Sequence, residues 1–358
     1  MKTRIALVCG GPSSEHEVSL WSTAAILKNI NPDKYEIFVF YIDKQFGSCF
    51  FPALAGSDLK IPVRNVAPAR QPNGSHGGGH SVAGGSEDKS LFLPFLEGIE
   101  KNLKTVDKAV LMGIHGEFVE DGRLQNILDF FGIKYTGSGM AASVLAMDKY
   151  SSTNLVEKVL GVRLPKTIIF NPDSSDPDYK QIDFPVILKP NDAGSSVGVK
   201  ILKTENELKT EIEKLKKDSK FDYWLLQEYI DDAIELSCGC LQKANKEFIQ
   251  LPPIEIIPQK AEFFDYDSKY QKGGSKEIAP PESTSKELSA KISLLACQIH
   301  QLLRCKTYSR SDFLVKGNEI YYLEINTLPG MTQTSLLPQE AKAAGISFSE
   351  LIDFIVEN

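Results

Sequence analysis

Apolar runs and helical patterns alternate along the first part of the chain. Residues 4–9 form an apolar run typical of a buried strand, residues 10–14 contain the Gly-Gly-Pro of a tight loop, and residues 18–30 have helical periodicity. Further apolar runs at residues 35–41 and 106–114 predict two more strands. Strands that alternate with helices in this way are typical of an open α/β domain.

This first domain is expected to span residues 1–148 and to contain an insertion. Residues 65–90 are rich in Gly, Ser and Pro and bury too little apolar surface to fold by themselves, so we expect a flexible segment there. Helical periodicity returns over residues 121–131, and Gly132 is a typical stop signal for that helix.

Two further lobes are predicted after residue 148. Residues 149–235 contain expected strands at 184–189 and 223–228, with a charged helix at 205–217 between them. Residues 236–358 are rich in strand patterns and contain an amphipathic helix and two paired strands, expected at residues 285–303, 308–315 and 320–325. A chain of 358 residues exceeds the usual size of one hydrophobic core, which agrees with several lobes.

Composition and charge narrow the classes of partner. The formal net charge is −7, so the chain lacks the broad basic surface with which proteins bind nucleic acids or membranes nonspecifically. Its apolar runs are too short for a signal peptide or a membrane span. Six scattered cysteines make no disulfide framework, and we expect Cys238 and Cys240 on one face of a buried strand rather than at a zinc site. A cytoplasmic protein without nucleic-acid or membrane partners is therefore expected.

Four polar residues lie on the two paired strands expected near the C-terminus. Alternation places Arg310 and Asp312 on one face of the first strand, and likewise Glu324 and Asn326 on one face of the second. If the two faces coincide, three oxygen-bearing side chains and one guanidinium converge. Oxygen ligands of this kind suit Mg²⁺, which leaves its other positions to water and phosphate. The pattern therefore predicts a nucleotide–metal site.

The turn between these strands decides whether the two polar faces coincide. A two-residue turn at residues 317–318 would place Asp312 opposite Leu323. Glu324 would then point to the other face of the hairpin. We therefore expect either a three-residue connection at residues 317–319 or a β-bulge, because each would restore the shared face.

Two other segments carry groups that bind phosphates. Lys189 ends a predicted strand, and the Gly/Ser loop that follows supplies backbone amides and the hydroxyls of Ser195 and Ser196. This loop differs from the common P-loop, because it lacks the Gly-Lys-Ser/Thr sequence. A polar loop that contains Lys269 and Tyr270 has the composition of an active-site lid.

Four segments together resemble the D-alanine:D-alanine ligases. They are GGPSSEHEVS at residues 10–19, HGEFVEDG at 115–122, YTGSG at 135–139 and EINTLPGMT at 324–332. Their order and spacing match over nearly the whole chain, and the last segment is far more specific than a single short motif. The resemblance implies a three-lobed ATP-grasp fold of the α/β and α+β class. In that fold two α+β lobes clamp ATP, and an N-terminal open α/β domain, the pre-ATP-grasp domain, helps to hold the first amino acid.

The resemblance also implies roles for individual residues. ATP would be bound by Lys149, Lys189, Ser196, Glu228, Glu235 and Lys269. Two Mg²⁺ or Mn²⁺ ions would be bound by Asp312, Glu324 and Asn326. The first D-alanine would meet Glu15 and His115, and the carboxylate of the second would meet Ser335 and Leu336. The developing oxyanion would be stabilised by Arg310 and the backbone N–H of Gly330, and a hydrogen-bond chain would join Glu15, Ser195 and Tyr270.

The reaction that the resemblance implies is ATP-dependent ligation of two D-alanine molecules through an acyl phosphate, for peptidoglycan synthesis and by a homodimer. The alternatives are a D-alanine:D-lactate or D-alanine:D-serine ligase, another ATP-grasp carboxylate–amine ligase, and a nucleotide-binding regulator without turnover. Two positions depart from the family's usual pattern: Ala193 replaces a common glutamate, and Val119 replaces a common glycine.

Overall fold

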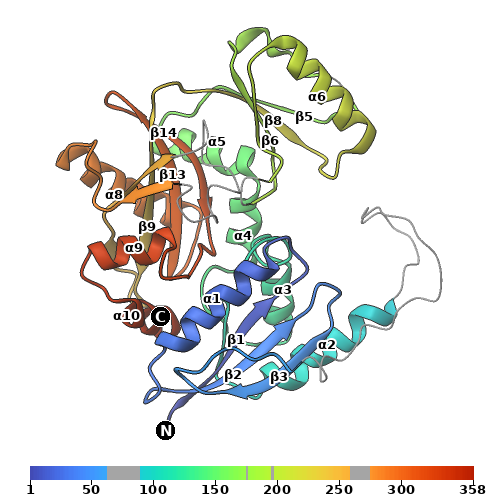
Figure 1. The fold of residues 1–358 in the computed structure, drawn as a ribbon, viewed down its shortest axis with the longest axis vertical. Coiled ribbons are helices and arrows are strands. Elements are labelled where there is room, and N and C mark those ends of the chain that lie inside the picture. The colour runs from blue at the N-terminus through green and yellow to red at the C-terminus, as the bar shows by residue number, and fades with distance from the viewer. Residues whose placement is uncertain (63–88, 175, 195–196, 259–274) are drawn as a thin grey trace. The chain divides into compact units, whose positions relative to one another are not determined.

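The structure, a computed structural model, describes residues 1–62, 89–174, 176–194, 197–258 and 275–358. Residues 65–88 of the expected insertion lie outside the described residues. The expected lid, the loop that contains Lys269 and Tyr270, also lies outside them as far as residue 274. The chain divides into two compact units (Figure 1). The first contains Met1–Met140, Leu328–Pro338 and Ile346–Asn358, and the second contains Ala141–Thr327 and Gln339–Gly345.

A four-stranded sheet with the order β3-β2-β1-β4 forms the centre of the first unit (Figure 1). Its strands are β1 (Thr3–Gly10), β2 (Tyr35–Ile42), β3 (Ser48–Ala53) and β4 (Lys108–Val110). Strand β1 is parallel to β2 and β4, whereas β3 is antiparallel to β2. The helices that belong wholly to this unit include α1 (His16–Asn29), α2 (Lys89–Leu103), α3 (Arg123–Phe130) and α10 (Phe348–Glu357). This is the open α/β domain expected from the sequence.

Strand β4 is shorter than the apolar run at residues 106–114 predicts. Only Lys108–Val110 pairs with β1. The next backbone N–H, that of Leu111, donates instead to Thr136 Oγ1 at 2.9 Å. The chain therefore leaves the sheet early, and the rest of the apolar run is buried in a loop that ends at His115.

The C-terminal helix α10 packs within the first unit. Lys34, just before β2, forms ion pairs with Asp353 at 2.8 Å and with Glu357 at 2.7 Å. Lys108 Nζ on β4 donates a hydrogen bond to Val356 O at 2.5 Å. The C-terminal residues expected in a third lobe are therefore shared between the two units.

The second unit contains two separate sheets. One has the order β5-β8-β6-β7 and consists of β5 (Thr167–Phe170), β6 (Val186–Pro190), β7 (Lys200–Leu202) and β8 (Trp224–Glu228). The other has the order β12-β11-β9-β13-β14, with β10 beside β9. Its strands are β9 (Ile234–Gln242), β10 (Phe248–Gln250), β11 (Ile254–Pro258), β12 (Ser275–Ile278), β13 (Tyr308–Lys316) and β14 (Glu319–Asn326). The helices are α4 (Met140–Met147, whose first residue belongs to the first unit), α5 (Lys149–Leu160), α6 (Glu205–Asp218), α8 (Lys286–Leu302) and α9 (Leu336–Ala343, whose first turn belongs to the first unit).

Each sheet of the second unit has a hydrophobic core of its own. In the smaller sheet, Val186 and Leu226 pack with Ile212 of α6. In the larger sheet, Phe313 and Tyr322 pack with the apolar face of α8. The core of the larger sheet also contains Val156 and Val162, which were expected in the smaller lobe at residues 149–235, so α5 packs with the larger sheet.

The cysteines lie in the hydrophobic interior. All six are free and buried. Cys238 and Cys240 lie two residues apart on β9 with fully buried side chains, as predicted for a buried strand. Among the described residues, no helix is both long enough and apolar enough to cross a membrane.

The β13–β14 hairpin brings the predicted polar faces together through a bulge. Lys316 pairs with Glu319, so the connection has two residues, and the three-residue alternative was wrong. The register then shifts between Asp312 and Phe313. Because of this shift, Asp312 faces Glu324 and, two residues on, Arg310 faces Asn326. The bulge expected from the sequence is confirmed.

Candidate active site

A cavity of about 430 Å³ lies in the second unit between strands of its two sheets. The walls come from β6 and β8 of the smaller sheet and from β9, β11, β13 and β14 of the larger one. Six residues singled out in the sequence line this cavity: Lys149, Lys189, Glu228, Glu235, Asp312 and Glu324. Its size and mixture of charged and apolar walls are typical of a site for a nucleotide-sized ligand.

Two lysines supply the positive charge of the cavity. Lys149 is the first residue of α5, and its Nζ lies 2.5 Å from Ala193 O and 3.3 Å from Glu324 Oε2. Lys189 projects from β6; burial lowers its pKa to about 8, Glu324 opposes that shift, and the charge of Lys149 adds to it. Two neighbouring cations in one cavity suit a polyphosphate. Ala193 contributes its backbone carbonyl to this contact, which is available whatever side chain stands at that position.

Arg310 and Asp312 form a buried pair beside the cavity. Arg310 donates from Nε to Asp312 Oδ1 and from Nη2 to Oδ2, each at 3.0 Å. Ser237 Oγ on β9 donates to Asp312 Oδ1 at 2.5 Å. Burial opposes the charge of Arg310, but Asp312, Glu340 and Glu324 together raise the pKa of Arg310 above its usual range. The guanidinium is therefore charged and held in a fixed orientation.

The facing pairs of the hairpin provide oxygen donors for a metal ion. Asp312 and Glu324 contribute carboxylates and Asn326 an amide oxygen, which is the donor set that Mg²⁺ prefers. Among the described residues, no group of three or more His, Cys, Asp or Glu side chains is arranged so that it could hold a metal ion, so any metal here would depend on the amide or on ligand oxygens as well. A metal ion would also have to share Asp312 with Arg310.

The bulge gives the cavity an apolar wall beside its acidic residues. Neighbouring residues of a regular strand point to opposite faces, yet Leu323 and Glu324 both line the cavity. On β13, Asp312 and Leu314 line it with ordinary two-residue spacing. The extra residue at the bulge therefore places one apolar and one acidic side chain next to each other.

Two further carboxylates line the cavity together with apolar side chains. Glu228 Oε2 accepts a hydrogen bond from Lys166 N at 3.0 Å, and Glu228 N donates to Lys166 O at 2.8 Å. Glu235 lies on β9 opposite Ile256 and also lines the cavity. Apolar walls between hydrogen-bonding groups suit a flat base with its attached sugar.

A second group of predicted residues meets in the first unit. His115 Nδ1 donates to Leu328 O at 3.1 Å, and because a carbonyl only accepts, the proton is on Nδ1. Ser22 Oγ lies 2.9 Å from Nε2 and donates to it. Burial lowers the pKa of His115, although Glu15 raises it, so the imidazole is neutral with a fixed tautomer.

Glu15 is buried beside His115 at the start of α1, and its side chain does not cap that helix. A Cβ atom on Gly116 would lie 2.9 Å from Glu15 Oε2 and 2.7 Å from Ser13 Oγ, and Gly116 has a φ of +82°. Both the space and the backbone conformation therefore require glycine at this position.

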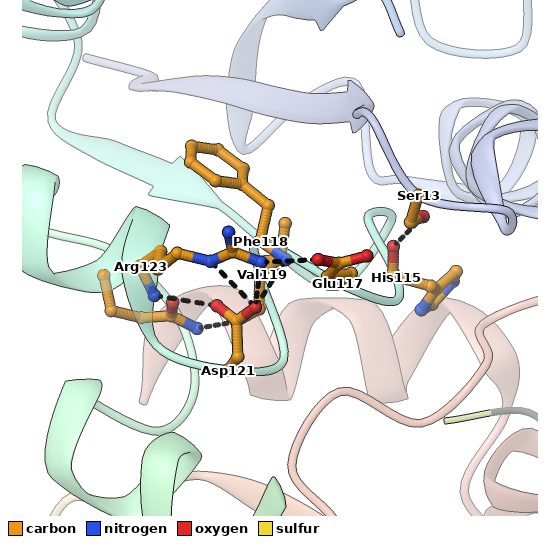
Figure 2. A network of polar contacts seen from close by, with 8 residues as sticks. Ser13, His115, Glu117, Phe118, Val119, Asp121 and Arg123 are labelled. Carbon is orange, nitrogen blue, oxygen red and sulfur yellow. Dashed lines mark hydrogen bonds and ion pairs between the residues drawn. The ribbon is translucent and has the colours of Figure 1, made fainter. Parts of the chain in front are cut away.

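The loop that follows His115 is fixed by charged residues (Figure 2). Phe118 has a left-handed φ of 80°, and its N–H donates to Asp121 Oδ2 at 2.7 Å. Arg123 Nη2 pairs with Asp121 at 2.6 Å and with Glu117 at 3.1 Å. Val119 is buried and is not among the residues with positive φ, so the loop closes without the glycine usual at that position.

The segment after β14 carries three further predicted residues. Gly330, Ser335 and Leu336 belong to the first unit, where Leu328 contacts His115. Ser335 Oγ accepts a hydrogen bond from Thr332 N at 3.0 Å, and a Cβ on Gly330 would lie 2.9 Å from the same oxygen. Arg310, which the resemblance assigns to the same oxyanion as Gly330, belongs to the second unit.

Four predicted residues, Ser195, Ser196, Lys269 and Tyr270, lie outside the described residues. Conversely, sequence reasoning missed Ser237, Asn191 and Glu340. Ser237 could have been found, because it shares a face of β9 with Glu235 by two-residue spacing. Glu340 is fully buried on α9, and its sequence neighbours carry no signal of a site.

The whole chain is similar to proteins of one family. The family models described as "D-ala D-ala ligase N-terminus" and "D-ala D-ala ligase C-terminus" match residues 4–138 and 167–357. A D-alanine–D-alanine ligase of Leptospira biflexa is 34% identical over 99% of this chain and 98% of its own length. One from Syntrophobacter fumaroxidans is 40% identical over 70% of this chain and 80% of its own.

Solved structures show the same likeness. The D-alanine–D-alanine ligase of Bacillus anthracis complexed with ATP has a TM-score of 0.71 and 28% identity, and the match covers 99% of this chain and 96% of that chain. The VanG D-Ala:D-Ser ligase of Enterococcus faecalis has a TM-score of 0.74 and 26% identity, with 99% of each chain covered. Together with the site geometry, these likenesses show that the chain belongs to the D-alanine–D-alanine ligase family, with its multi-domain ATP-grasp fold.

Proposed function

We propose that this protein uses ATP to join two D-alanine molecules into D-alanyl-D-alanine. The observation that carries the proposal is the cavity in which Lys149 and Lys189 face the Asp312–Glu324 pair. This cavity is large enough for a nucleotide. Its lysines can bind the phosphates, and its carboxylates can bind the metal ions that accompany them. Family membership over the whole chain supports the same activity.

Mg²⁺ or Mn²⁺ fits the acidic side of the cavity. We assign two ions to Asp312, Glu324 and Asn326; on the hairpin, Asp312 is paired with Glu324, and Asn326 is paired with Arg310. When bound, such ions neutralise charge on the phosphates of ATP. The Arg310–Asp312 pair must then share the Asp312 carboxylate with an ion, and Arg310 keeps its remaining donors for the substrate.

The proposed first step activates a carboxylate. A carboxylate oxygen of the first D-alanine attacks the γ-phosphorus, the bond to the bridging oxygen breaks, and ADP leaves. Lys149 and Lys189 bind the phosphates during this step, and Ser196 and Lys269 also bind ATP. Glu228 and Glu235 hold the adenine and ribose ends. Glu15 binds the ammonium of the first D-alanine, and neutral His115 lies beside it.

In the proposed second step the amine of the second D-alanine loses a proton and attacks the acyl carbon, and inorganic phosphate leaves with one former carboxylate oxygen. Arg310 and the N–H of Gly330 stabilise the oxyanion that forms. Ser335 and Leu336 meet the carboxylate of the second substrate, and Glu15, Ser195 and Tyr270 form the closing hydrogen-bond chain. We further propose a cytoplasmic homodimer that supplies peptidoglycan synthesis.

The test is ADP release coupled to product analysis with a panel of second substrates. We expect ADP release that depends on D-alanine and one dipeptide per ADP, with D-lactate and D-serine used poorly at neutral pH. Likeness to a D-Ala:D-Ser ligase makes D-serine the most informative competitor. Preferred use of D-serine or D-lactate would replace the proposed second substrate, and nucleotide binding without turnover would favour a regulator.

A further inference from the structure

One asparagine connects the two lysines of the cavity. Asn191 follows β6 directly, and its side chain is buried. Its Nδ2 donates to Asp148 Oδ1 at 2.9 Å, and its Oδ1 accepts from Tyr150 N at 2.9 Å. Its backbone carbonyl accepts from Lys149 N at 3.2 Å. Asn191 therefore bonds to three consecutive residues, with Lys149 in the middle.

The same asparagine is fixed to the strand that carries the other lysine. Lys189 lies two residues before Asn191 at the end of β6. Asn191 N donates to Tyr223 O at 3.0 Å, which ties it to the residue before β8. The N-terminus of α5 and the end of β6 are thus joined through one buried residue, Asn191, by two side-chain hydrogen bonds and one backbone hydrogen bond.

Asp148, the partner of Asn191, is itself part of a fixed helix start. It caps α5 by accepting from Ser151 N at 3.0 Å and from Ser151 Oγ at 2.6 Å. Burial works against its charge, yet hydrogen bonds from Ser151 and Asn191 lower the pKa of Asp148 below its usual value. The first turn of α5, which presents Lys149, is therefore held by an ionised cap and by Asn191 together.

We propose that Asn191 is a positioning residue that holds Lys149 at the right distance from Lys189 to bind the phosphates of a nucleotide. This inference rests on the proposed nucleotide use of the cavity. Two cations repel each other when no nucleotide is bound, and the contacts of Lys149 with Ala193 O and Glu324 are made by its side chain and not by its backbone. The bonds of Asn191 fix that backbone before the ligand arrives.

The alternative is that Asn191 only anchors α5, and a comparison of two ligands separates the roles. Asn191→Ala should weaken ATP binding about tenfold, measured by calorimetry with the full-length protein, and leave adenosine binding unchanged. Adenosine has the base and sugar but no phosphate. Asn191→Asp keeps the shape and the acceptor for Tyr150 N but faces Asp148 with a second carboxylate, so it should show the same pattern if Asn191→Ala folds poorly.

Asn154→Ala is the matched control, because Asn154 lies on the same helix and its Nδ2 also donates to Tyr150, at the carbonyl oxygen, from an exposed position. It should bind ATP and adenosine as the wild type does. Equal losses of ATP and adenosine affinity in Asn191→Ala would overturn the proposal, because a purely structural role predicts them.

A double-mutant cycle gives the sharper test. If Asn191 acts through Lys149, then Asn191→Ala should change ATP affinity less than about twofold once Lys149→Met is present. Additive losses would overturn the inference. The cycle measures nucleotide binding in the absence of D-alanine. If the protein binds ATP but does not ligate D-alanine, the proposed function is contradicted, whereas the cycle still tests the role of Asn191.

Discussion

Asp312 lies directly opposite Glu324 although the turn of their hairpin has the length that would place Asp312 opposite Leu323. One extra residue in β14 corrects the register. The correction has two consequences, because it aligns two carboxylates and also turns Leu323 into the cavity beside them. A single bulge thus builds both the acidic and the apolar wall.

Removing either carboxylate charge should nearly abolish ligation. We expect Asp312→Asn and Glu324→Gln to lower kcat at least about a hundredfold at saturating magnesium, since each loses negative charge that would bind the metal ions, and those ions would offset the phosphoryl charge. Asp312→Asn keeps an acceptor for Ser237 Oγ but loses the charge paired with buried Arg310, so its Tm should fall. Glu324→Gln leaves that pair intact and separates loss of activity from loss of stability. Full activity in both variants would refute the metal assignment.

Shortening Leu323 should affect binding rather than chemistry. Leu323→Ala removes apolar surface from the cavity wall, so KM for ATP should rise about three- to tenfold while kcat changes little. Leu294→Ala, at a half-exposed leucine of α8, is the control and should leave KM unchanged. A fall in kcat at constant KM would place Leu323 near the reacting groups instead.

ATP affinity should decline at alkaline pH because of Lys189. Burial lowers the pKa of Lys189 to about 8, so the side chain is charged below that pH and becomes neutral above it. We expect the Kd for ATP to rise between about pH 7.5 and pH 9, and Lys189→Arg to flatten this dependence, since arginine stays charged. Adenosine binding serves as the control. Identical pH profiles for wild type and Lys189→Arg would contradict the assignment.

Glu340 should make the protein less stable as pH rises. Burial raises the pKa of Glu340 from 4.5 to about 8, against the opposing effects of Arg310 and of the Gly239 N–H that Oε2 accepts at 2.7 Å. Within the described part of the chain, Oε1 has no hydrogen-bond partner. Between these pKa values the folded state keeps a proton that the unfolded state releases, so the free energy of unfolding falls with increasing pH.

Glu340→Gln removes this dependence and keeps an acceptor for Gly239 N. Urea unfolding at about pH 5 and pH 8 should show the variant gaining stability relative to wild type by at least about 1 kcal/mol at the higher pH. Glu211→Gln, at a carboxylate that is paired with Lys200 and Lys214, is the control. Parallel pH dependences for wild type and Glu340→Gln would show that Glu340 is ionised throughout.

Local patterns located several of the elements correctly. Alternation and helical periodicity located β1, β2, α1, α6, α8 and both strands of the polar hairpin to within a few residues. The strand at 106–114 was too long in prediction, because the bond from Leu111 N to Thr136 Oγ1 joins residues distant in the sequence. Periodicity contains no information about such a contact.

The candidate site could be predicted where charged side chains recur at the two-residue spacing of a strand. Arg310, Asp312 and Glu324 stand out because charges on core strands require partners. The sequence could not decide between a three-residue turn and a bulge, because each would bring Asp312 and Glu324 to the same face of the hairpin. Asn191 was missed because an asparagine after a strand is ordinary loop composition, and only the fold brings it to Asp148 and Tyr150.

The most direct test of the central claim follows an oxygen atom. D-Alanine labelled with oxygen-18 in its carboxylate should transfer one labelled oxygen to inorganic phosphate for each D-alanyl-D-alanine formed with ATP, because the carboxylate is phosphorylated and the phosphate then leaves. Mass spectrometry of the phosphate and the dipeptide measures both. Dipeptide formation with unlabelled phosphate would contradict an acyl phosphate, and no dipeptide at all would contradict the proposed ligase activity.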